Sequence, residues 1–207
     1  MNNDNDIKLV EVLSKHYTET FDLLKTVVAR RDRLFLYILL VIFIVLLYMS
    51  NPSVMSDWVN SFFSSKVVGN DTTTKMTPLI DVSVIGVVLL LGLLSLSHTY
   101  FQTVLHIERQ YDYVYQLEDN LGVYFNDNAF TREGKHYRKY KRKFSSWTRF
   151  IFWYLFPILY LLFIFFWLWF LFTTSQTPIG YKIVDFLITV SILVSLGLYL
   201  MAIIKRK

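Results

Sequence analysis

Residues 30–50 read "RRDRLFLYILLVIFIVLLYMS", and this stretch decides the fold class. Three arginines stand in its first four positions, and no charge follows from Leu34 to Met49. Lipid gives backbone amides no hydrogen-bond partner, so an uncharged apolar run of this length has to be helical. The stretch therefore predicts a membrane-spanning helix, with Arg33 reaching back to the headgroup region.

Three further apolar runs predict three further spans: Leu79–Leu96, Phe150–Phe172 and Ile183–Ile204. Asp81 and Asp185 are the charged residues within them, one acid near the start of each of two runs. Hydrophobic residues make up 54% of the 207-residue chain and charged residues 18%, which excludes general disorder. The expected fold is all-α, a four-span transmembrane helical bundle with long cytoplasmic helical extensions of spans one and two.

The distribution of basic residues predicts the orientation. Of the 21 lysines and arginines, only Lys66, Lys75 and Lys182 lie in the first and third connections between spans. Basic residues gather on the cytoplasmic side of membrane proteins, so both termini and the middle connection are expected there. The resulting segments are a cytoplasmic helix 1–33, span one 34–50, a periplasmic loop 51–78, span two 79–97, a cytoplasmic helix with a basic interfacial segment 98–149, span three 150–172, a periplasmic turn 173–182, span four 183–204 and a cytoplasmic tail 205–207.

Two cytoplasmic segments continue the spans as amphipathic helices. Apolar residues recur every three or four positions from Ile7 to Val28, and no Gly or Pro separates them from Leu34. A second stripe continues span two as far as Gly122, a residue typical of a helix end. We expect the two helices to pair antiparallel, stripe to stripe, with other subunits or a soluble partner completing the stripes. The expected partner or oligomer surface comprises Tyr17, Phe21, Leu24, Tyr100, Ile107, Tyr111 and Val114.

A basic segment precedes span three. Aromatic residues recur there at helical spacing between Tyr137 and Trp147, which is typical of a helix lying on the inner leaflet. Its expected anionic-lipid contacts are Lys135, Arg138, Lys139, Lys141, Arg142 and Lys143. A solvated positive-inside anchor, a site for a phosphorylated ligand and a docking surface for an acidic protein are the alternatives.

Polar residues within the spans allow a second hypothesis. Asp81, Asp185, Ser191 and Ser195 are candidates for a pore or its outer mouth if several copies assemble. The alternatives are that the acids mark the interface, or pair with Lys182, and that the serines permit close helix packing.

Chemistry-bearing motifs are missing from the sequence. The chain has no cysteine, which excludes disulfides, thiol nucleophiles and cysteine metal sites. No phosphate-binding loop, dinucleotide fingerprint, zinc protease motif or nucleophile elbow occurs. His98, Gln102 and His106 share one helical face, either as an ordinary polar face or as a ring around a vestibule in an oligomer. We expect no enzyme activity, no cofactor, no metal and no direct nucleic-acid binding, because positive-inside topology accounts for most of the +5 charge.

A resemblance to bacterial anti-phage defence proteins suggests a context. The features are "RRDRLFLYILLVIFIVLL", the extension "HIERQYDYVYQLEDNLG" and the "TREGKHY…W" entry into span three. In architecture the chain resembles the four-span membrane subunit of the Kiwa system, and it is similar in layout to the four-span accessory protein of type VI CRISPR loci. The first resemblance implies a tetramer in the bacterial inner membrane that holds a cytosolic protein partner. No functional residue is carried over, because no motif maps residue by residue.

Two functions follow from these expectations. The first is a non-enzymatic inner-membrane sensor and scaffold that oligomerises and recruits or regulates a cytosolic effector. The second is a pore-forming effector that depolarises the cell. Membrane lipids are expected partners in both.

Overall fold

The computed structural model describes residues 3–67, 81–124, 147, 150–173 and 178–205, and these are almost entirely helical. Four helices are long and apolar enough to cross a membrane, as the sequence predicts. The all-α fold class is therefore confirmed, and the chain is a multi-pass membrane protein with a helical bundle.

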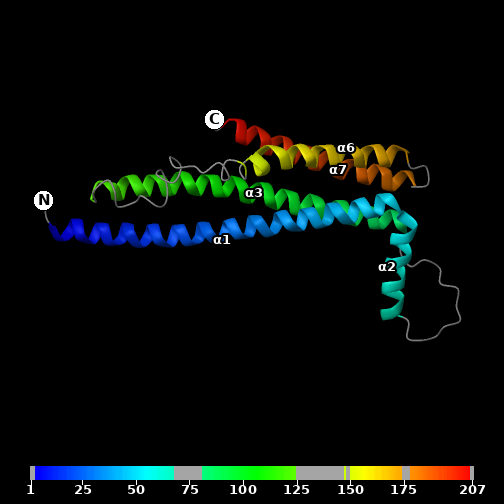
Figure 1. Cartoon of the computed structure of the whole chain (residues 1–207), viewed down its shortest axis with the longest axis horizontal. Coiled ribbons are helices and arrows are strands. Elements are labelled where there is room, and N and C mark those ends of the chain that lie inside the picture. The colour runs from blue at the N-terminus through cyan, green and yellow to red at the C-terminus, as the bar shows by residue number, and fades with distance from the viewer. Residues whose placement is uncertain (1–2, 68–80, 125–146, 148–149, 174–177, 206–207) are drawn as a thin grey trace.

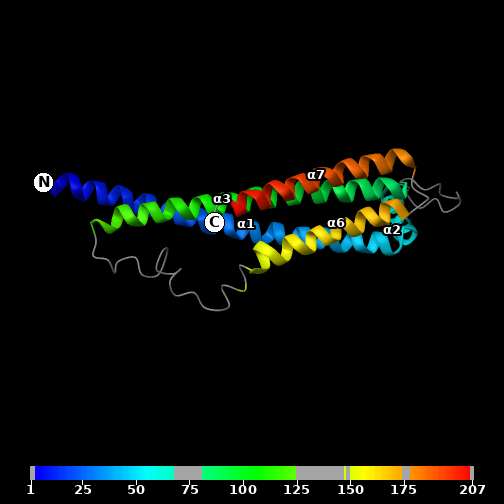
Figure 2. The same cartoon turned by 90° about the horizontal axis from the view of Figure 1, so that it is seen from above.

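Two long helices run along the length of the molecule. Helix α1 runs from Asn3 to Ser50 and helix α3 from Val82 to Gly122, each without interruption. They lie side by side and antiparallel along most of their length (Figures 1 and 2). The predicted continuity of both extensions with their spans is confirmed, and so is the end of the second at Gly122. The physical reason is the absence of Gly, Pro or turn residues at either junction.

The other two spans pack against the apolar half of this pair. Helix α7, Ile179–Ile204, packs on α3, and helix α6, Phe156–Thr173, packs on α7 (Figure 2). Aromatic contacts close the bundle between α6 and α1, with the rings of Tyr48 and Trp167 stacked at 6.1 Å. The most deeply buried core side chains, each at most 2% exposed, are Ile38, Val45, Leu90, Leu93, Tyr100, Tyr160, Ile164, Trp167, Ile192, Leu196 and Tyr199.

A glycine sets the approach of α1 to α3 near one end of the bundle. A Cβ placed on Gly86 would lie 3.1 Å from the hydroxyl oxygen of Tyr48. Any side chain there would push the two helices apart or displace the tyrosine ring. The absence of a side chain at Gly86 therefore permits the close packing of Tyr48 on α3.

Two segments differ from the sequence prediction. Residues Pro52–Val67, expected as part of the periplasmic loop 51–78, form helix α2, which turns away from the bundle (Figure 1). Proline favours the first position of a helix, so Pro52 starts a new helix after the break at Asn51. Helix α7 begins at Ile179 rather than at residue 183.

Span three opens with a local change of helix type. Residues Ile151–Leu155 form a π-helical turn, η1, in which the N–H of Phe156 bonds the carbonyl of Ile151. The turn lies directly before Pro157, which has no N–H to continue the ordinary pattern. A proline inside a helix disturbs the hydrogen bonds of the preceding turn, and here that turn is widened.

Candidate functional site

The part of α1 and α3 that continues beyond the apolar bundle is the candidate site. We call residues 7–33 of α1 and 98–122 of α3 the hairpin extension. Figure 1 shows that most of it lies beyond the ends of α6 and α7. An amphipathic helix pair in water has to bury its apolar stripes, so its packing decides which residues remain available to a partner.

The apolar stripes of the hairpin extension pack mainly against each other. Leu24, Ile107 and Val114 form one core cluster, each at most 3% exposed. Tyr100 is fully buried in the bundle core. This corrects the expected partner surface at these four positions, because the chain itself covers them. The reason is the antiparallel register, which sets one stripe directly over the other.

Polar contacts between the helices hold that register. The His16 Nε2 atom lies 2.7 Å from the Tyr113 hydroxyl oxygen. The Tyr17 hydroxyl donates to Glu118 Oε1 at 3.2 Å. Glu118 is 7% exposed, so this hydrogen bond satisfies a carboxylate that would otherwise be costly to bury. Tyr17 was predicted to contact a partner, but its hydroxyl bonds to Glu118 of the same chain.

An open groove lies on one side of the hairpin extension, and we call it the docking groove. Its volume is about 250 Å³. Two predicted partner-surface residues that the chain leaves accessible, Phe21 and Tyr111, line it together with the buried Leu24. Phe21 is half-buried and the Tyr111 side chain is 37% exposed, so these two rings offer apolar surface to a ligand.

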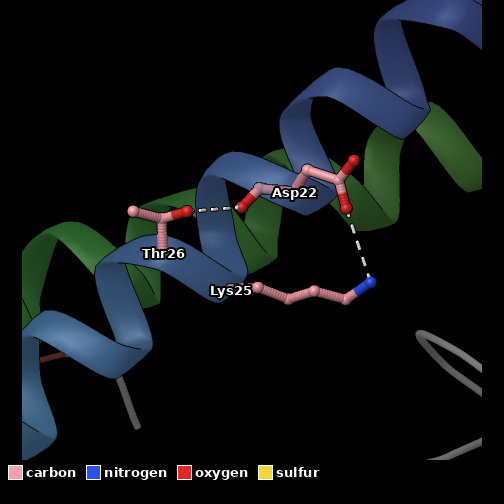
Figure 3. Close-up of polar contacts among 3 residues, drawn as sticks. All are labelled: Asp22, Lys25 and Thr26. Atoms are coloured by element: carbon pink, nitrogen blue, oxygen red, sulfur yellow. Dashed lines mark hydrogen bonds and ion pairs between the residues drawn. The ribbon is translucent and has the colours of Figure 1, made fainter.

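Opposite charges stand at the docking groove, carried by Lys25 and Asp32. The Lys25 ammonium lies 3.5 Å from Asp22 Oδ1 and 4.4 Å from the centre of the Phe21 ring. Figure 3 shows the lysine side chain reaching out from α1, while Thr26 bonds the backbone carbonyl of Asp22. Exposed ion pairs contribute little stability, so Lys25 can exchange its partner at small cost. The spacing of residues in the sequence did not indicate Lys25 and Asp32 as site residues. They line the groove only because Tyr111 of α3 lies beside them.

The arrangement at the docking groove can bind another molecule. Apolar rings flanked by one cation and one anion can bind an apolar segment with a charged end. Across the described ranges, no three acidic or histidine side chains gather at metal-binding spacing.

The two intramembrane acids have different surroundings. Asp81 is exposed and caps α3, where its carboxylate accepts the N–H of Ser83 at 2.8 Å. Asp185 is 4% exposed inside the bundle, and its Oδ1 atom has no hydrogen-bond partner among the described residues. The Thr189 hydroxyl donates to the backbone carbonyl of Asp185, not to its carboxylate.

The predicted pore serines lie on another face of α7. Ser191 is exposed and donates to the carbonyl of Leu187 at 2.9 Å, and Ser195 is half-buried. Asp185 lies instead on the buried face with Ile188 and Ile192. The structure therefore does not bring the four pore candidates together within one chain.

Two further predictions concern the middle connection. The expected lipid contacts between Lys135 and Lys143 lie outside the described residues. The shared face of His98, Gln102 and His106 lies on α3, and the Gln102 amide nitrogen is 2.8 Å from His98 Nε2.

Comparison with known proteins identifies no similar protein. No family model matches the chain, and no curated protein and no solved structure is similar to it.

Proposed function

We propose that this chain is a non-enzymatic sensor and scaffold of the bacterial inner membrane, with both termini in the cytoplasm. It oligomerises, and its docking groove recruits or regulates a cytosolic effector. Anti-phage defence is the context that the resemblance suggests, and a tetramer is the assembly that it favours.

The uninterrupted path of α1 and α3 carries this proposal. Each helix runs from a lipid-facing span into the hairpin extension without a break. A change in packing among the spans is therefore passed to the docking groove as movement of a rigid helix pair.

Exposed apolar side chains on the hairpin extension support a protein partner. Leu9, Val12 and Leu23 are each 45% exposed or more, in a region beyond the lipid-facing runs. Such side chains mark a surface that another protein chain covers. Tyr111 adds an aromatic ring, a side chain that often contributes strongly to binding energy.

The test is an affinity purification from the native host, followed by native mass spectrometry of the detergent-solubilised complex. Tyr111→Asp places a charge in the docking groove, and we expect it to lower the yield of the soluble partner by about tenfold or more. Gln116→Asp is the matched control, because Gln116 is exposed on the same helix as Tyr111 but does not line the groove. Equal partner yield from wild type and Tyr111→Asp would contradict the proposal.

The alternative is a pore-forming effector, and the buried carboxylate of Asp185 favours it. Ionisable groups at membrane depth often mark ion pathways. In this case several copies assemble around a lumen and the wild-type protein conducts ions. The scaffold predicts a homo-oligomer with a stoichiometric soluble protein and no ion flux.

A further inference from the structure

A second groove lies between α1 and α3, where both helices leave the apolar bundle, and we call it the basic groove. Its volume is about 470 Å³, within the range of small-molecule sites. Arg30 lies one turn before the apolar run that starts at Leu34, and Thr99 lies one turn after the run that ends at Leu96. The polar lining consists of Arg30, Thr99, Gln102, Thr103, His106 and Arg109.

The charges in the basic groove are of one sign. No acidic side chain is among the described residues that line it. Arg30 and Arg109 approach from different helices, both are exposed, and neither forms an ion pair with another described residue. Two guanidinium groups facing one hollow repel each other, and an anion between them relieves that repulsion. Guanidinium groups match phosphate oxygens with paired hydrogen bonds.

Uncharged hydrogen-bond donors also line the basic groove. The amide of Gln102 is held by His98 and still has a second N–H to offer, and the ring of His106 can donate. The hydroxyls of Thr99 and Thr103 donate to backbone carbonyls of their own helix. These threonines therefore form a polar floor, while the arginines supply the charge.

The surface above the basic groove is apolar and open. Gly92 lies two turns before Thr99 on the same face of α3, and a Cβ there would meet nothing within 4 Å. Exposed apolar side chains occur on both helices in this region: Val88, one turn before Gly92 on α3, and Tyr37, two turns after Arg30 on α1. A ligand with a phosphate at one end and a hydrocarbon chain at the other fits both parts.

We propose that the basic groove binds a phosphate group, and that this group belongs to an anionic lipid whose acyl chain lies along the open face at Gly92. The interaction fixes the depth at which the helix pair leaves the leaflet. It requires neither the scaffold role nor the docking groove, which opens between other side chains of the same helix pair.

The experiment uses the full chain in detergent, supplied with phosphatidylglycerol or phosphatidylcholine, and counts retained lipid by native mass spectrometry. We expect the wild type to retain phosphatidylglycerol preferentially. The double variant Arg30→Gln/Arg109→Gln loses that retention by about tenfold or more, because it removes charge-assisted hydrogen bonds. The matched control is Arg33→Gln/Lys205→Gln, which removes the same charge from exposed positions at the same end of the spans.

A second arm identifies the source of the phosphate. Gly92→Leu adds a side chain to the open face, where its Cβ meets nothing within 4 Å. We expect it to lower lipid retention while both arginines remain. Binding of inorganic phosphate, measured by calorimetry, distinguishes a soluble ligand. If inorganic phosphate binds through the two arginines and Gly92→Leu retains lipid like the wild type, the phosphate site stands and the lipid source is overturned.

Two results would overturn the site itself. One is equal phosphatidylglycerol retention by the wild type and Arg30→Gln/Arg109→Gln, with no phosphate binding by either. The other is an equal loss in the Arg33→Gln/Lys205→Gln control, which would reduce the effect to the overall charge of that end of the bundle. Circular dichroism of each variant establishes that the helices are intact.

Discussion

At the scale of single residues, the two acids of the spans differ in what surrounds them. Asp81 stabilises the start of α3 through the N–H of Ser83, and its side chain is exposed. Asp185 is buried, and one carboxylate oxygen has no partner among the described residues. A buried polar group without a hydrogen-bond partner costs stability, and proteins keep such a group where function requires it.

Asp185→Asn keeps the size of the side chain and removes its ionisable group. For a scaffold we expect the thermal unfolding midpoint in detergent to rise, with a gain of roughly 1 kcal/mol. Asp57→Asn, on an exposed position of α2, is the control and should leave the midpoint unchanged. Liposome flux is measured alongside: wild-type flux that Asp185→Asn reduces would favour the pore over the scaffold.

At the scale of elements, a small apolar cluster helps to hold the two helices of the hairpin extension together. Leu24, Ile107 and Val114 form a cluster separate from the core of the four-helix bundle, and each is at most 3% exposed. Less apolar packing therefore holds α1 against α3 in the hairpin extension than in the four-helix bundle.

Val114→Asp buries a charge in that cluster, and we expect it to separate the two helices of the extension. The local cost is about 3 kcal/mol or more, because the carboxylate finds no partner there. Hydrogen exchange should then accelerate in residues 7–33 while the spans keep their protection. The control Gln116→Asp puts the same charge on an exposed position of α3. Unchanged exchange in Val114→Asp would mean that the cluster does not hold the extension together.

At the scale of the whole molecule, the lysines and arginines of the described residues are unevenly distributed. Eight lie on the hairpin extension or at the end of α7, and two lie elsewhere, Lys66 on α2 and Lys182 at the start of α7. The hairpin extension and the end of α7 lie toward one side of the bundle, and helix α2 lies at the other (Figure 1). From this distribution, the positive-inside rule predicts that the hairpin extension and the end of α7 lie in the cytoplasm.

The absence of native cysteine makes this orientation directly measurable. Val12→Cys, Ser53→Cys and Lys205→Cys each introduce one exposed thiol, at the extension, on α2 and after α7. In intact spheroplasts we expect a membrane-impermeant maleimide to label only Ser53→Cys. After lysis all three should react, which controls for accessibility. Labelling of Val12→Cys in intact spheroplasts would reverse the proposed topology.

The sequence by itself determined the four spans, the continuity of α1 and α3 and the antiparallel partnership of their stripes. These depend on apolar runs, helical spacing and the absence of breakers, all of which are local properties. It missed helix α2, because a polar stretch with a short aromatic motif carries a weak helix signal. Only the tertiary structure decided that Leu24 and Val114 are covered by the chain itself, that Asp185 is buried while Asp81 is a cap, and that Arg30 and Arg109 share a groove. The reason is register: residues far apart in sequence meet only after the two helices have paired at one offset.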